Sequence, residues 1–135
     1  MGNRILVVDD DPDTVVYLSS FLEDHGFQTA AAHDASEALA VLEEFDPDAV
    51  LVDVMMPGRS GLDLLVRIRR SERFENVPIL VVTGNDHILA DDFRSYLGSH
   101  HGVRGPDGVV GKPVDAEALL RLVRSLTNEA EQETG

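Results

Sequence analysis

Apolar residues are distributed along this chain in two alternating patterns. Short continuous apolar runs of strand length are separated by longer stretches in which apolar residues recur every three or four positions. The continuous runs predict strands covered on both faces, and the spaced stretches predict amphipathic helices. Strands are expected at residues 4–8, 27–32, 49–53, 79–83 and 109–110, the second being composed of small residues and therefore near an edge of the sheet.

The predicted helices follow the strands one by one. The first begins at Pro12 with Asp11 as its N-cap and stops before Gly26, and either Asp34 or Ser36 caps the second. The third is expected to end near residue 71, the fourth spans 88–97 and the fifth about 115–126, with a Gly-rich loop at 98–108.

Strands that alternate with helices predict an α/β fold, a parallel sheet with helices on both faces. Right-handed crossovers make a doubly wound sandwich the natural closure. The 135 residues suit one domain at residues 1–127, followed by a polar tail at 128–135. In such a fold ligands bind beyond the carboxyl ends of the strands, where this chain places Asp9, Asp10, Asp53, Thr83 and Lys112.

The composition narrows the classes of function. With 25 acidic and 11 basic residues the formal net charge is −14, which argues against direct nucleic-acid binding. There is no cysteine, so disulfides and thiolate metal sites are excluded. No apolar run reaches the roughly 18 residues of a membrane span and no signal peptide is recognisable, so we expect a cytoplasmic protein without membrane insertion. Met1 favours an intact amino terminus, and the carboxyl end leaves open whether the chain is free-standing or cut from a longer protein.

The acids at the predicted strand ends suggest metal and phosphoryl chemistry. An acidic turn at residues 9–11 could simply cap a helix, but with Asp53 at the end of a neighbouring strand a cation site becomes the better explanation. Ligands that are all oxygen favour Mg²⁺ (or Mn²⁺). An aspartate can also act as a nucleophile in phosphoryl transfer. Asp53 is the candidate nucleophile, with Lys112 as a cation and Thr83 as a hydroxyl donor beside it.

Four motifs in this order resemble one known family, the receiver domain of two-component response regulators (the CheY-like superfamily). The resemblance covers about residues 4–126 and implies a (βα)5 flavodoxin-like fold with strand order 2-1-3-4-5. The motifs are Ile5-Leu6-Val7-Val8-Asp9-Asp10-Asp11-Pro12, Asp53-Val54-Met55-Met56-Pro57-Gly58, the strand ending at Thr83-Gly84, and Lys112-Pro113.

The resemblance implies a phosphorylation-dependent signalling switch. Asp53 would accept a phosphoryl group from the phosphohistidine of a histidine kinase, in a Mg²⁺-dependent reaction. Asp10, Asp53 and the carbonyl of Met55 would bind the metal directly, and Asp9 mainly through water. Lys112 would pair with Asp53 or its phosphoryl group, and Thr83 would hydrogen-bond a phosphoryl oxygen. The chain would be no enzyme beyond its own phosphorylation and dephosphorylation.

The implied partners are a cognate histidine kinase or phosphotransfer protein and a downstream protein target or effector domain, with a phosphorylation-linked homodimer left open. Two departures favour the main alternative, a receiver-like interaction module that works without phosphorylation. Val109 stands where the family usually has an aromatic residue, and the loop at 98–108 is long. A third alternative, a small metal-dependent phosphohydrolase, is weak because the sequence shows no element for substrate specificity.

Overall fold

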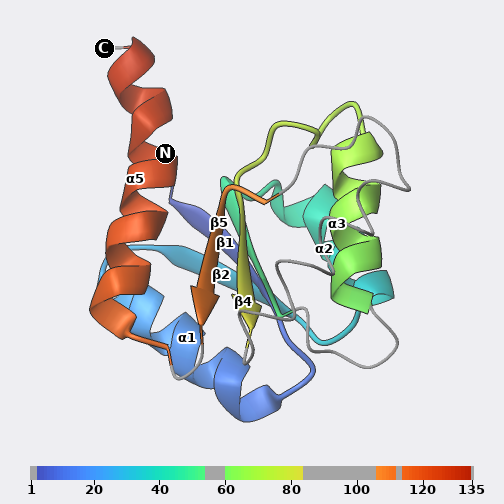
Figure 1. The fold of residues 1–135 in the computed structure, drawn as a ribbon, viewed down its shortest axis with the longest axis horizontal. Helices are drawn as coiled ribbons and strands as arrows, with labels where there is room; N and C mark the ends of the chain where they lie inside the picture. Colours follow the sequence, from blue (N-terminus) through green and yellow to red (C-terminus); the bar gives the residue numbers. More distant parts are fainter. Residues whose placement is uncertain (1–2, 54–59, 84–105, 112–113, 135) are drawn as a thin grey trace.

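A five-stranded sheet forms the centre of the molecule (Figure 1). The computed structural model describes residues 3–53, 60–83, 106–111 and 114–134, and only the backbone of residues 60–62, 83 and 128–134. All strand pairs are parallel, in the order β2-β1-β3-β4-β5, which confirms the predicted fold class and the order that the family resemblance implied. The strands are β1 (Arg4–Val8), β2 (Gln28–Ala32), β3 (Ala49–Asp53), β4 (Ile79–Thr83) and β5 (Gly108–Gly111).

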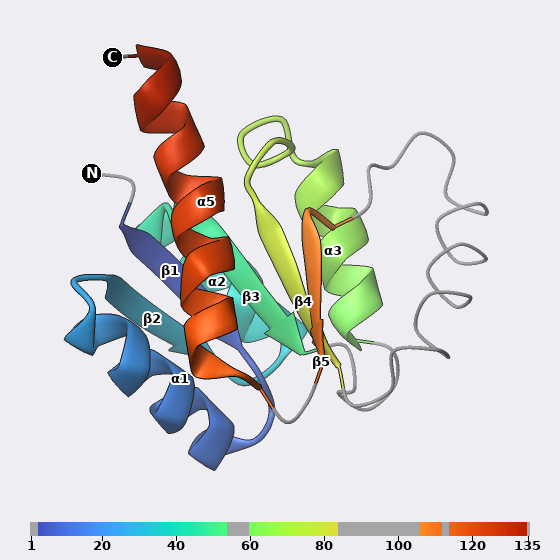
Figure 2. The ribbon, with the colours of Figure 1, turned by 60° about the vertical axis from the view of Figure 1, so that its left-hand side comes forward.

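Helices cover both faces of the sheet, as Figures 1 and 2 show. Apolar side chains of α1 and α5 pack on one face, and those of α2 and α3 pack on the other. The described helices are α1 (Pro12–Asp24), α2 (Ala35–Phe45), α3 (Ser60–Arg70) and α5 (Ala116–Thr134). The predicted helix at 88–97 and most of the predicted loop at 98–108 lie outside the described residues.

The helix ends follow from local chemistry. Asp11 caps α1 by accepting the backbone N–H of Asp13 at 3.0 Å, and Pro12 occupies the first helical position. The chain leaves α1 through Gly26, whose φ of 92° suits glycine. Asp46 ends α2 in the left-handed conformation with φ 52°, which Asp tolerates better than most residues.

The predicted end of the last helix near residue 126 is wrong. Helix α5 continues through the polar tail to Thr134, and its carboxyl end extends past the edge of the sheet in both views (Figures 1 and 2). Residues 128–134 are Asn-Glu-Ala-Glu-Gln-Glu-Thr. Glu, Ala and Gln favour helix and no Gly or Pro interrupts them, so their polarity alone does not end the helix.

Replacing the cap of α2 is expected to destabilise the protein measurably. Asp34 accepts the backbone N–H of Glu37 at 2.7 Å, so the structure selects Asp34 over Ser36 as the N-cap. Asp34→Ala is expected to lower the free energy of unfolding by about 1 kcal/mol, because that N–H loses its partner. Urea unfolding followed by circular dichroism measures the change. The exposed Ser36→Ala is the control, and an equal loss in both variants would contradict the assignment.

Candidate acidic site at the carboxyl ends of the strands

Three carboxylates meet at one edge of the sheet. Asp9 and Asp10 directly follow β1, and Asp53 is the last residue of β3. One ligand oxygen from each lies within 4.8 Å of the others. Asp9 and Asp53 are buried, with 2% and 4% of their surface exposed, whereas Asp10 is exposed. The cluster therefore has two buried acids and one acid at the surface.

The sheet register explains why these acids converge. Strands β1 and β3 are parallel neighbours, and Val8 pairs with Val52. The residues that follow this pair, Asp9 and Asp53, therefore leave the two strands side by side. The backbone N–H of Asp9 donates to the carbonyl of Ala32 at 3.1 Å, which fixes the chain against the end of β2 as well.

The turn from β1 into α1 is held by its own acids. The carboxylate of Asp9 accepts the backbone N–H of Asp11 at 2.9 Å, and Asp11 in turn caps α1. The second carboxylate oxygen of Asp11 accepts the hydroxyl of Thr14 at 3.0 Å. Asp11 is therefore a capping residue, and Asp9 and Asp10 are the acids of this turn that lie near Asp53.

The donor set of this cluster fits a hard cation. At a separation near 4 Å and an effective dielectric constant of about 20, two carboxylates repel each other by about 4 kcal/mol. A divalent cation bound among them offsets that repulsion, and oxygen-only donors suit Mg²⁺ rather than Zn²⁺. Asp9, Asp10 and Asp53 are thus a chemically suitable set for holding Mg²⁺, with the rest of its octahedral shell left for water or other oxygens.

The structure places the other predicted site residues only in part. Thr83 ends β4, and its backbone pairs with Gly111 of β5 at the same edge of the sheet as Asp53. The side chain of Thr83 is not among those described. Lys112 and Met55 lie outside the described residues. The roles assigned to these three residues stay predictions.

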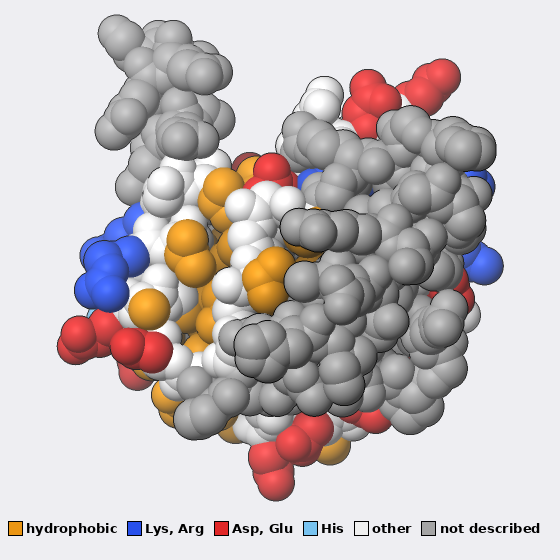
Figure 3. All heavy atoms as spheres, viewed as in Figure 1, with side chains coloured by type: hydrophobic (Ala, Val, Ile, Leu, Met, Phe, Trp, Pro, Cys, Tyr) orange, Lys and Arg blue, Asp and Glu red, His pale blue; other side chains and the backbone are white. Residues whose placement is uncertain are grey.

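Val109, at the position where the family usually has an aromatic residue, lies at the surface. Its side chain is 48% exposed, while the next residue, Val110, is buried among side chains of α1 and α5. Side chains alternate along a strand, so Val109 faces away from that cluster. In the space-filling view, hydrophobic side chains reach the surface in the region of β5 and α5 (Figure 3). A valine exposed in this way belongs to the surface of the sheet and not to the core.

Comparison with known proteins decides the family. The model of the response regulator receiver domain family matches residues 5–124, nearly the whole chain. This chain belongs to that family. The predicted resemblance is therefore confirmed. Receiver domains generally bind Mg²⁺ at an acidic pocket, and this chain has an acidic cluster at the carboxyl ends of its strands.

Two relatives show how far the likeness to this receiver domain extends. The DNA-binding response regulator MtrA of Mycolicibacterium smegmatis is 38% identical over 133 residues, which are 98% of this chain and 54% of MtrA. Protein PilH of Pseudomonas aeruginosa is 31% identical over 123 residues, 91% of this chain and 96% of PilH. The chain thus spans about half the length of MtrA and nearly all of PilH.

Solved structures agree with the fold of the receiver domain. A receiver domain protein described as CheY-like, from Methanospirillum hungatei, superposes with a TM-score of 0.80 and 27% identity, covering 97% of this chain and 98% of the other. A sensor protein from Polaromonas gives a TM-score of 0.82 and 28% identity over 93% and 96% of the two chains. Among the residues that the structure describes, every helix is too short or too polar to cross a membrane.

Proposed function

We propose that this receiver domain is a phosphorylation-dependent signalling switch whose phosphoacceptor is Asp53. The observation that supports this most directly is the convergence of Asp9, Asp10 and Asp53 within 4.8 Å at the carboxyl edge of a parallel sheet. The phosphoryl donor to Asp53 would be the phosphohistidine of a histidine kinase or phosphotransfer protein. The phosphorylated domain would then act on a downstream protein or effector domain. The expected cytoplasmic location and phosphorylation-linked homodimer remain predictions.

Asp53 is the best placed of the three acids to act as the nucleophile. Asp9 supports the turn into α1 by accepting the backbone N–H of Asp11, and Asp10 lies at the exposed side of the cluster. Asp53 ends the central strand β3, whose backbone is held on both sides by β1 and β4. These strand pairings fix the backbone that carries the carboxylate, which reduces the freedom lost when a phosphoryl donor approaches in line.

In the proposed reaction a carboxylate oxygen of Asp53 attacks the phosphorus of the donor. The new bond joins that oxygen to phosphorus, and the bond from phosphorus to the histidine nitrogen breaks with its electron pair remaining on nitrogen. Asp9, Asp10 and Asp53 would hold Mg²⁺, which offsets negative charge on the transferring oxygens. The acyl phosphate carries about −1.5 to −2 charge where the free carboxylate carried one negative charge, so phosphorylation adds roughly one negative charge and new acceptor oxygens at this edge, enough to bias a neighbouring two-state segment.

Lys112 and Thr83 complete the proposed site. The backbone of Thr83 lies at the end of β4, next to β3, and Gly111 precedes Lys112 in the sequence. An ammonium group is a compact charge suited to pairing with one phosphoryl oxygen, and a hydroxyl group can donate a hydrogen bond to a second phosphoryl oxygen. Lys112 would pair with the carboxylate of Asp53 or with its phosphoryl group, and Thr83 would hydrogen-bond a phosphoryl oxygen.

Intact-mass measurement after incubation with acetyl phosphate and Mg²⁺ tests this function. We expect a gain of one phosphoryl group, no gain when EDTA removes the metal, and loss of the group with hydroxylamine, as for an acyl phosphate. Failure to gain mass with acetyl phosphate and with a phosphorylated histidine kinase would favour the phosphorylation-independent module, toward which the exposed Val109 points. Steady release of phosphate that does not depend on Asp53 would favour the hydrolase.

Asp10→Asn is expected to weaken Mg²⁺ binding by about tenfold or more. The substitution replaces a charged ligand of the cluster with a neutral one and leaves the two buried acids in place. Because a ligand of the native state stabilises it, the rise in melting temperature on adding Mg²⁺ should shrink in parallel. Calorimetric titration measures the affinity. Asp13→Asn, an exposed acid in the first turn of α1 outside the cluster, is the control and should keep wild-type affinity.

A further inference from the structure

An ion pair with a deeply buried arginine lies at the far end of the sheet from Asp53. Arg69, near the end of α3, donates from Nη2 to Oδ2 of Asp107 at 2.8 Å. Asp107 directly precedes β5, and Ile79 begins β4. Asp53 pairs with Val82, near the other end of β4. The Arg69–Asp107 ion pair and the acidic cluster therefore lie at opposite ends of the strands, separated by about 10 Å along β4.

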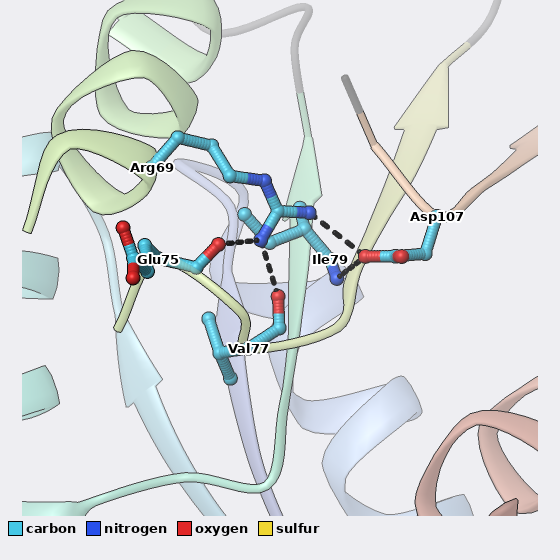
Figure 4. Close-up of polar contacts among 5 residues, drawn as sticks. All are labelled: Arg69, Glu75, Val77, Ile79 and Asp107. Carbon is cyan, nitrogen blue, oxygen red and sulfur yellow. Dashed lines mark hydrogen bonds and ion pairs between the residues drawn. The ribbon is translucent and has the colours of Figure 1, made fainter. Parts of the chain in front are cut away.

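Arg69 joins three parts of the chain. Its Nη1 donates to the carbonyls of Glu75 and Val77, at 3.1 and 2.6 Å, in the connection between α3 and β4. Its Nη2 reaches Asp107, as Figure 4 shows. The planar fork of a guanidinium holds its donors in fixed directions and so suits these separate acceptors better than a compact ammonium group would.

Asp107 connects the Arg69 ion pair to β4 and to the start of β5. Its Oδ2 also accepts the backbone N–H of Ile79 at 2.8 Å, and its own N–H donates to the carbonyl of Ile79 at 2.8 Å. Asp107 therefore holds the first residue of β4 through both its backbone and its side chain, and Figure 4 shows the side-chain contact. The side chain of Arg69 is only 1% exposed, and that of Asp107 is 23% exposed. A charge this deeply buried depends strongly on its partner.

Strand β5 has few other features that fix its alignment with β4. It has four residues, Gly-Val-Val-Gly, and ends the sheet order as an edge strand. Register is weakly specified in short Gly-rich strands, because few side chains distinguish one alignment from the next. Within β5 only Val110 is buried, whereas Val109 is 48% exposed.

Gly108 helps the alignment only modestly. It pairs with Leu80, and a Cβ added at Gly108 would lie 2.6 Å from Cδ2 of Leu80. The atom met is the far end of a flexible side chain, so a small movement could relieve the overlap. The hydrogen bonds at Asp107, immediately before Gly108, are therefore the stronger constraint on where β5 begins.

We propose that Arg69 and Asp107 are positioning residues that set the register of β5 and, through it, the backbone at the phosphoacceptor edge. In the observed register Thr83 pairs with Gly111, the residue before Lys112. A slip of one residue would move the chain by about 3.3 Å at this edge and turn alternate side chains to the other face. The effect on phosphorylation rests on the function proposed above, whereas the effect on register does not.

Loss of the Arg69–Asp107 ion pair should slow phosphoryl transfer and leave Mg²⁺ affinity nearly unchanged. Asp9 and Asp10 follow β1 and Asp53 ends β3, and both are central strands. Gly111, the residue before Lys112 in the sequence, pairs with Thr83 only in the observed alignment of β4 and β5. Arg69→Met keeps the aliphatic stem and removes the fork. It is expected to slow phosphorylation by acetyl phosphate about tenfold or more while Mg²⁺ affinity stays within about twofold of wild type.

Amide hydrogen exchange followed by NMR tests how firmly β5 is held against β4. In Arg69→Met the amides of β5 should exchange at least about tenfold faster, with those of β1 and β3 changed less. The melting temperature should fall by about 10 °C or more. Arg69→Lys, which keeps the charge without the fork, should give intermediate values. Arg73→Met is the matched control, because Arg73 forms its ion pairs with Glu43 and Asp46 at the surface.

A second variant separates the register role from a general loss of stability. If Arg69→Met does not fold, Arg69→Lys, which keeps a positive charge beside Asp107, provides the milder change, with the same selective but smaller loss of β5 protection expected. Wild-type protection of β5 in the variants would overturn the proposal, and so would equal loss of protection in all strands or a parallel loss of Mg²⁺ affinity. If the wild type itself gains no phosphoryl group, the proposed function fails, and selective loss of β5 protection would still support the register role.

Discussion

Asp53→Asn is expected to abolish phosphorylation of this receiver domain by acetyl phosphate, slowing it by at least about 10³-fold. The amide that replaces the carboxylate has no anionic oxygen to attack phosphorus. The change leaves size and shape nearly unchanged at a residue with 4% of its surface exposed. Intact mass after incubation with Mg²⁺ and acetyl phosphate measures the effect, with Asp13→Asn as a control that keeps all three clustered acids.

The stability of Asp53→Asn shows whether the variant loses phosphorylation because it lacks the nucleophile or because it unfolds. Removing one of three neighbouring carboxylates lowers their mutual repulsion, so Asp53→Asn should unfold at no lower urea concentration than the wild type in metal-free buffer. Adding Mg²⁺ should stabilise the wild type more than the variant, because the variant has lost a charged ligand. Phosphorylation of the variant at the wild-type rate would show that another residue is the acceptor.

Leu51→Ala is expected to cause a large loss of stability, about 3 kcal/mol in the free energy of unfolding. Leu51 is 1% exposed and lies in the cluster formed by β1, β3, α1 and α5. It precedes Asp53 by two positions and therefore shares its face of β3. Truncation removes most of the side chain from a closely packed site and leaves a cavity that the central strand cannot collapse to fill.

Urea unfolding of Leu51→Ala against Leu122→Ala checks the assignment of the core. Leu122 lies on α5 and is 37% exposed, so the same truncation there should lower the free energy of unfolding by about 1 kcal/mol or less. Equal losses at the two positions would contradict the burial of Leu51. Because Asp53 is on the same strand, we also expect Leu51→Ala to slow phosphorylation under conditions where the variant remains folded.

The sequence predicted most of the fold because its local signals agree with one another. Continuous apolar runs mark β1, β3 and β4, and Asp11 with Pro12 marks the start of α1. The end of α5 differs from its prediction for an identifiable reason. The polarity of residues 128–134 suggests that the helix has ended, although helix formation depends on backbone propensity as well as on burial.

The sequence also predicted most of the candidate site. Parallel strands bring their carboxyl ends to one edge, so the strand pattern alone predicts that Asp9, Asp10 and Asp53 meet. The Arg69–Asp107 pair could not be predicted in this way. Arg69 lies among other arginines at the end of α3, and it is 38 positions away from Asp107 in the sequence. Only the packing of α3 against the starts of β4 and β5 creates that contact.

By itself, therefore, the sequence determined the alternation of strands and helices, the edge at which the acids gather and the family that the chain resembles. These depend on local periodicity, on short motifs and on the general rules of parallel sheets. The tertiary structure decided which of the acids are buried, which residue caps α2, how far α5 extends and what holds the short strand β5 in place. Burial and the anchoring of β5 arise from contacts between residues distant in sequence, and no local pattern encodes them.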